Sequence, residues 1–208
     1  MIGTILIQIW EQSFPISNGM RHKYETRGIV LSRTPLGETN AFVTLLTPSL
    51  GIIRARAQGL RRPGAKLAAA LATFAESNVM LVRGKEGWRV VGAVLEENWF
   101  KKMNASAPRQ RAARVSGLLV RLVAGEAHDP GLFQIIKGYF EALADLPVTL
   151  HESAEALAAL RTLAALGLDA GEIPGDPSAF AEHLLSSIET ERTHYIARIN
   201  RGIAASGL

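Results

Sequence analysis

The side chains in this sequence that could perform chemistry are mainly cationic, and they are concentrated between residues 21 and 102. This stretch contains 14 Lys and Arg residues against 6 Asp and Glu, a net charge of +8, whereas residues 103–208 contain 9 basic and 12 acidic residues. Cationic groups without acidic neighbours attract polyanions such as the phosphate backbone of nucleic acids. The charge distribution therefore predicts an anionic partner for the first half of the chain.

Several of these cations are spaced as a binding surface would require. Arg54 and Arg56 are two residues apart in a β-type segment, so their side chains point to the same face of a strand. The loop at residues 58–66 contains Gly, Pro and three more cations. Trp88 lies among cations at a turn and is the ring expected to be exposed for base stacking, whereas most other rings, Phe42 among them, are expected in the core. The predicted nucleic-acid-binding residues are Arg33, Arg54, Arg56, Arg61, Arg62, Lys66, Arg83, Lys85 and Trp88.

Sequence patterns typical of catalysis are absent. There is no Walker A motif, no Gly-x-Gly-x-x-Gly and no His-Glu-x-x-His, and the five histidines are scattered. Glu96 and Glu97 are adjacent, so on a strand their carboxylates point apart. The chain contains no cysteine, which excludes disulfides, thiolate metal sites and a cysteine nucleophile. We therefore expect no enzymatic activity, no catalytic residues, no cofactor and no metal.

The basic half is organised as short β-type segments separated by turn residues. A compact hairpin is expected at residues 84–87, and the Ala- and Leu-rich residues 65–72 are expected to form a helix. Five strands with a helix between the third and the fourth is the plan of an OB-fold barrel, which binds oligonucleotides. The predicted strands are residues 26–33, 41–47, 51–58, 77–83 and 88–96.

The second half shows helical periodicity. Val115, Leu119 and Leu122 lie on one face of a first helix. Asp129 and Pro130 begin a second helix that ends before Pro147. The remaining predicted helices cover residues 153–166, 178–187 with Ser178 as its cap, and 189–204. The predicted fold class is therefore α+β: an N-terminal five-stranded OB-fold barrel followed by an all-α C-terminal helical domain.

Several segments of the basic half closely resemble the RecO family of recombination mediators. A Leu-Gly-Glu element combined with a Gln-Gly-Leu-Arg-Arg-Pro element at this spacing is more specific than either one alone. The matching segments are residues 27–31, 36–40, 45–47 with Gly51, and 57–67.

The resemblance implies an OB-fold, a helical domain and a role in DNA repair and recombination. Members of the family bind single- and double-stranded DNA, anneal complementary strands, and act with RecR to load RecA onto DNA coated by single-strand-binding protein. The loop containing Arg61, Arg62 and Lys66 corresponds to a DNA-contacting region. Many members carry a four-cysteine zinc module, which this chain lacks; the short loop at residues 171–177 takes its place, so zinc is not expected.

Residues 1–19 are interpreted as an extension or a misassigned start ahead of Met20, or as an extra strand; residues 20–100 as the DNA-binding domain; and residues 101–208 as the helical domain. A cytoplasmic, nucleoid-associated location is expected. Alternatives to a DNA mediator are an adaptor that recognises the acidic tail of single-strand-binding protein, and an RNA-binding OB module.

Overall fold

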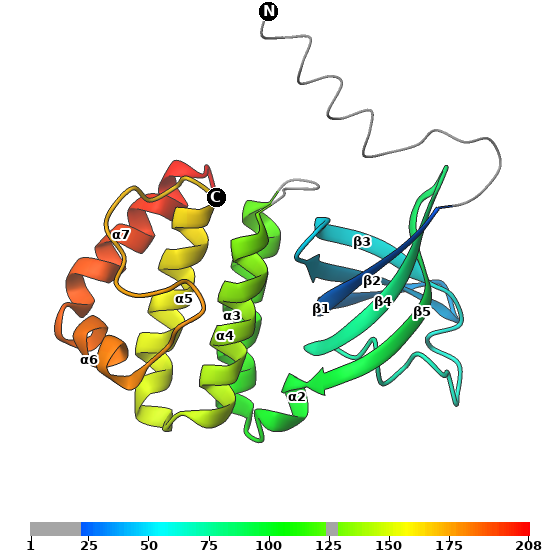
Figure 1. Ribbon diagram of the computed structural model, residues 1–208, viewed down its shortest axis with the longest axis horizontal. Coiled ribbons are helices and arrows are strands. Elements are labelled where there is room, and N and C mark those ends of the chain that lie inside the picture. Colours follow the sequence, from blue (N-terminus) through cyan, green and yellow to red (C-terminus); the bar gives the residue numbers. More distant parts are fainter. Residues whose placement is uncertain (1–21, 124–128) are drawn as a thin grey trace, which may run out of the picture.

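The structure is a computed structural model that describes residues 22–123 and 129–208. A β-barrel and a layered group of helices lie side by side (Figure 1). The interpretation of residues 1–19 lies outside the described residues.

Five strands form the barrel in the closed order β1-β2-β3-β5-β4. All neighbouring strands are antiparallel except β3 and β5, which pair in parallel over residues 55–57 and 88–90. The five predicted strands are confirmed, each slightly longer or shorter than expected. Their bounds are β1 (Lys23–Leu36), β2 (Asn40–Thr47), β3 (Gly51–Ala57), β4 (Ala75–Gly84) and β5 (Gly87–Asn98).

The two faces of the barrel strands are buried by different partners. Alternate residues such as Val43, Ala55 and Leu81 fill the barrel interior. On the outer face, Leu46 and Ile52 belong to the same hydrophobic cluster as the helices. The outer face of the barrel and the helices therefore share one hydrophobic cluster, while the barrel interior forms a second one.

The predicted helix at residues 65–72 is wrong: this segment forms consecutive turns without an α-helix. The carbonyl of Ala70 accepts a 2.7 Å hydrogen bond from the Ser77 hydroxyl. The Phe74 N–H donates instead to the Val30 carbonyl at 2.8 Å. The Ala70 carbonyl and the Phe74 N–H thus form hydrogen bonds with the barrel strands. In a longer helix these two groups would form hydrogen bonds within the helix.

The helices form successive layers beside the barrel (Figure 1). α3 and α4 contact the strands, α5 packs on both of them, and α6 and α7 pack on α5. The predicted second helix is confirmed, with Asp129 as its N-cap and a 2.7 Å bond from the Gly131 N–H. The bounds are α2 (Trp99–Lys102), α3 (Ser106–Leu122), α4 (Pro130–Asp145), the 3-10 helix η1 (Val148–Leu150), α5 (His151–Ala165), α6 (Glu182–Thr190) and α7 (Arg192–Ala205).

Two buried arginines hold the loop between α5 and α6. Arg161 donates to the carbonyls of Pro174, Pro177 and Ala179 at 2.7–3.0 Å. Arg198 bonds to Asp169 and to the carbonyl of Glu172. These contacts order the loop between α5 and α6.

The prediction that Ser178 caps a helix ending at Ser187 is wrong. The backbone N–H and hydroxyl of Ser178 both donate to Asp176, which fixes a turn before α6. The helix therefore begins later, at Glu182, and ends at Thr190. The last helix likewise begins at Arg192 rather than residue 189.

A buried carboxylate lies at the junction between the barrel and the helices. Glu76 of β4 is 3% exposed and accepts a 3.2 Å hydrogen bond from the Trp99 indole N–H. Its other oxygen lies 3.7 Å from the Arg27 guanidinium and 3.5 Å from the Lys137 ammonium. Glu76 thus connects β1, β4, α2 and α4 through polar contacts.

Candidate functional site

The most cationic concave surface described is a groove of about 990 Å³ on the barrel, at the end that carries the β4–β5 hairpin. Glu86 is the one acidic residue among the described residues that line it. The hairpin predicted at residues 84–87 is confirmed by the pairing of Gly84 with Gly87. The lining residues are His22, Tyr24, Leu36, Phe42, Arg56, Arg83, Gly84, Lys85, Glu86, Gly87, Trp88 and Arg89.

The strand register brings two arginines together in this groove. Arg56 of β3 is the register partner of Arg89 of β5. Adjacent like charges repel each other, and this costs stability. Within residues 22–123 and 129–208 no carboxylate forms an ion pair with either arginine. A bound anion would relieve this repulsion, so the pair is suited to holding a phosphate.

The groove contains four of the nine predicted binding residues: Arg56, Arg83, Lys85 and Trp88. The expectation that Trp88 is an exposed stacking ring is wrong. Its side chain is 8% exposed and joins the hydrophobic cluster of the barrel interior. The Tyr24 ring packs on it edge to face at 5.1 Å, and the Arg83 guanidinium lies 5.3 Å from its centre. Trp88 therefore forms part of the groove's base.

Arg54 lies on the outer face of β3 beside the groove but does not line it. The register pairs Arg54 with Thr44 and Arg56 with Phe42, so the predicted common face of the two arginines is confirmed. The Arg54 guanidinium lies 4.1 Å from the centre of the Phe42 ring. Phe42, expected in the core, is only partly buried and belongs to neither hydrophobic cluster.

The basic loop after β3 is tied to the β1–β2 turn. The Arg61 guanidinium donates to the Gly37 carbonyl at 2.6 Å, and the Arg61 N–H donates to the Thr39 carbonyl. The Asn40 side chain accepts from the Gly59 N–H at 2.9 Å. The two sequence elements that carry the family resemblance are thus in direct contact.

Three other predicted cations lie outside the groove-lining set. Arg62 and Lys66 are exposed on the loop and form no ion pair within the described part of the chain. Arg33 is also exposed, but its register partner is Val43, whose side chain faces the barrel interior. Arg33 therefore lies on the opposite face of the sheet from Arg54 and Arg56.

The sequence-based selection missed Arg89, Phe42 and Tyr24 as groove residues. The sequence could have predicted Arg89, because it adjoins Trp88 and is one of the basic residues around the predicted hairpin. Arg89 lies beside Arg56 because β3 and β5 pair in parallel, although about 30 residues separate the two strands in sequence. No local sequence pattern predicts such a pairing.

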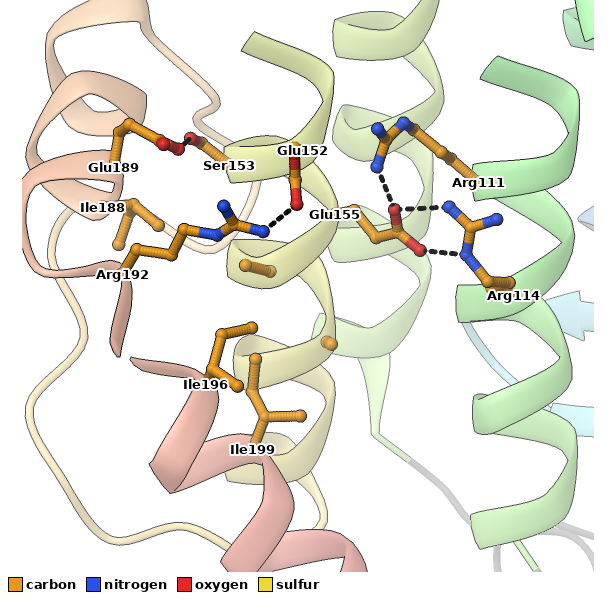
Figure 2. A pocket seen from close by; sticks show the side chains of 12 residues that line it. Arg111, Arg114, Glu152, Ser153, Glu155, Ile188, Glu189, Arg192, Ile196 and Ile199 are labelled. Carbon is orange, nitrogen blue, oxygen red and sulfur yellow. Dashed lines mark hydrogen bonds and ion pairs between the residues drawn. The ribbon is translucent and has the colours of Figure 1, made fainter. Parts of the chain in front are cut away.

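A second hollow, of about 440 Å³, lies among α3, α5, α6 and α7. Its floor is apolar, with Ala156, Ala159 and Ile199 among the lining residues. Figure 2 shows that its arginines point to glutamates: Arg111 and Arg114 both bind Glu155, and Arg192 binds Glu152.

This neutralisation limits what the hollow can bind. The three arginines of the hollow are balanced by Glu152, Glu155 and Glu189. The hollow therefore carries no excess of positive charge among its lining residues. The hydrogen bonds that Arg114 donates to Glu155 also raise the pKa of Arg114. Arg111 and Arg114 thus stabilise the packing of α3 on α5 rather than extending the cationic groove.

Metal-binding clusters and membrane-spanning helices are both absent from the described residues. Among the described residues, no group of three or more His, Asp or Glu side chains is arranged to hold a metal ion. In residues 22–123 and 129–208, no helix combines the length and the apolar character needed to span a bilayer.

Comparison with known proteins identifies related sequences. The model of a family described as "Recombination protein O N terminal" matches residues 20–93. A DNA repair protein RecO of Dehalococcoides mccartyi is 30% identical over 122 residues, which cover 59% of this chain and 48% of the relative. A protein of the same name from Synechococcus elongatus is 41% identical over 66 residues, covering 32% of this chain and 25% of the relative.

A third relative extends the same match. The DNA repair protein RecO of Roseiflexus sp. is 33% identical over 121 residues, covering 58% of this chain and 42% of the relative. The chain spans about half the length, or less, of the curated relatives it matches. The family match covers all five strands except the end of β5, and therefore almost the whole barrel with its groove. Residues 20–93, and with them almost the whole barrel, are therefore similar to the N-terminal region of RecO proteins.

Proposed function

We propose that this chain acts in recombinational DNA repair by binding DNA along the groove of its N-terminal barrel, which we interpret as an OB-fold. The observation that carries the proposal is the Arg56–Arg89 pair, which has no carboxylate partner among the described residues and lies in a groove with two further cations. The names of the relatives, DNA repair protein RecO, support the same role.

The wider cationic surface extends this interface. Arg54 lies beside the groove, and Arg61 is fixed to Gly37, next to the groove residue Leu36. Arg62 and Lys66 follow on the same loop and supply further phosphate contacts. Arg33, on the other face of its strand, contributes only to DNA that wraps around the β1–β2 hairpin. In this division of roles, residues 20–100 bind DNA and residues 101–208 support the barrel and meet protein partners.

Annealing needs no bond chemistry, because it requires only that cations screen two phosphate backbones while the strands find their register. We include annealing of complementary strands in the proposal, together with RecR-assisted loading of RecA onto DNA coated by single-strand-binding protein. The acidic tail of single-strand-binding protein is then a competitor for the same cations of the barrel. Addition of that tail as a peptide should lower the affinity for oligonucleotide. A cytoplasmic location follows from this role.

The proposal is tested by the salt dependence of binding to a fluorescent oligothymidine. For single-stranded DNA, the slope of log affinity against log salt falls by about 0.7 for each phosphate contact that is lost. The double variant Arg56→Gln, Arg89→Gln should therefore lower the slope by about 1.4. Arg201→Gln, at an exposed position on α7, is the matched control and should leave the slope unchanged.

Two results would contradict the proposal. One is an unchanged slope in the double variant. The other is an equal loss per removed charge, so that the double variant loses twice as much slope as the Arg201 control, which would indicate that net charge alone attracts the DNA. A competition between RNA and DNA of one sequence addresses the RNA-binding alternative, since the proposal requires that RNA does not displace DNA at lower concentration.

A further inference from the structure

Phe42 differs from the other rings of the groove in how it is packed. Tyr24 and Trp88 pack edge to face and belong to, or pack against, the cluster that fills the barrel interior. Phe42 lies on the outer face of β2, and neither hydrophobic cluster contains it. Phe42 is partly buried and lines the groove, so part of its ring is accessible to a ligand there.

The surroundings of Phe42 match the chemistry of a nucleotide. Its register partner on β3 is Arg56, so a cation and an aromatic ring lie side by side at the separation of neighbouring strands. Arg89 lies one strand further, beside Arg56. A nucleotide combines a planar base with an anionic phosphate, and this row offers a ring for the first and two guanidinium groups for the second.

Arg54 holds the Phe42 ring in position. Its guanidinium lies 4.1 Å from the ring centre, within the range of a cation–π contact. Since Arg54 is not among the groove-lining residues and Phe42 is, the contact with Arg54 is made from outside the groove. The Phe42 ring thus remains accessible to a ligand in the groove, while the contact with Arg54 restrains its position.

We propose that Phe42 is the base-stacking residue of the groove, and that Arg54 is its positioning residue. This inference rests on the proposed DNA-binding function and specifies its substrate as a strand with unpaired bases. Within a duplex each base is already stacked between its neighbours, whereas a single strand can place one base on the ring. Phosphate contacts alone would not distinguish the two forms.

The test compares two ligands that have the same phosphates but differ in bases. One is a fluorescent oligothymidine, and the other is an oligomer of equal length built from abasic deoxyribose phosphates. Stacking on an aromatic residue should make the thymidine oligomer bind about 5- to 150-fold more tightly. Phe42→Leu should abolish that ratio while the abasic oligomer keeps its affinity, and Phe42→Tyr should retain the ratio because it keeps a ring.

Phe100 provides a matched control. It is 41% exposed, and the Arg109 guanidinium lies 4.1 Å from its ring centre, but it does not line the groove. Phe100→Leu should therefore leave the ratio of the two affinities at the wild-type value. Arg54→Met removes the guanidinium above the ring. It should lower the ratio of the two affinities in part, because it should weaken binding of the abasic oligomer less than binding of the thymidine oligomer.

The outcomes separate this inference from the proposed function. If wild-type protein binds both oligomers equally, or if Phe42→Leu keeps the wild-type ratio, the stacking role is wrong even though DNA binding stands. If the ratio falls equally in Phe42→Leu and Phe100→Leu, the stacking site is not at the groove. If the wild-type protein binds neither oligomer, the proposed function itself fails.

Discussion

Replacing Glu76 with Gln should destabilise the whole protein by about 2 kcal/mol. The change converts a charge-assisted hydrogen bond from Trp99, worth about 1.5–3 kcal/mol, into a neutral one of about 1 kcal/mol. Arg27 and Lys137, which face the carboxylate, are partly exposed, so solvent screening limits each ion pair to about 0.5 kcal/mol. The amide retains the size of the side chain, so no cavity adds to the loss.

The assay is urea denaturation followed by tryptophan fluorescence. With a dependence of about 2 kcal/mol per molar urea, the midpoint should fall by about 1 M. We expect a single transition in both proteins, because the outer face of the barrel and the helices share one hydrophobic cluster. Trp88 in the barrel and Trp99 at the junction then report the same event.

Glu97→Gln is the control for the loss of a carboxylate on the neighbouring strand. Its partner Lys102 is about half exposed, and the pair lies at the surface, so its loss should cost less than about 0.5 kcal/mol. A Glu76→Gln midpoint equal to that of the wild type would refute the role assigned to the buried carboxylate. Two separate transitions in the wild type would refute the shared hydrophobic cluster.

Two further predictions concern the loop between α5 and α6. The hydrogen bond from Arg198 lowers the pKa of Asp169, so the stability that this carboxylate provides is present above its unfolded pKa, near 4, and disappears as the pH falls through the lower folded value. Asp169→Asn should therefore be less stable than the wild type at pH 7, with urea midpoints that converge towards pH 3; a constant difference would contradict this. Gly138→Ala should destabilise by about 1–3 kcal/mol, because the new Cβ would clash with the Ser178 carbonyl oxygen. Gly117→Ala, which meets nothing within 4 Å on α3, should instead be neutral or stabilising by up to about 1 kcal/mol in the same melts, and similar effects at both positions would refute the close approach.

Part of the candidate site was accessible to sequence reasoning, because strand periodicity and turn residues are local properties. The common face of Arg54 and Arg56 follows from their spacing of two residues, and the β4–β5 hairpin follows from its glycines. The sequence did not predict which aromatic ring faces the groove. Phe42 and Trp88 both occur in strands, and only the sense in which each strand enters the barrel decides which ring is inside.

The sequence by itself determined the strands, most of the helices, the excess of cations in the first half and the absence of thiol chemistry, since each depends on composition or on spacing within one segment. Tertiary structure alone decided that residues 65–72 are not helical, that Arg111 and Arg114 are neutralised by Glu155, and that Arg56 lies beside Arg89. Each of these results depends on a partner far away in the chain, and the free energy of such contacts exceeds the small local preferences that a sequence pattern records.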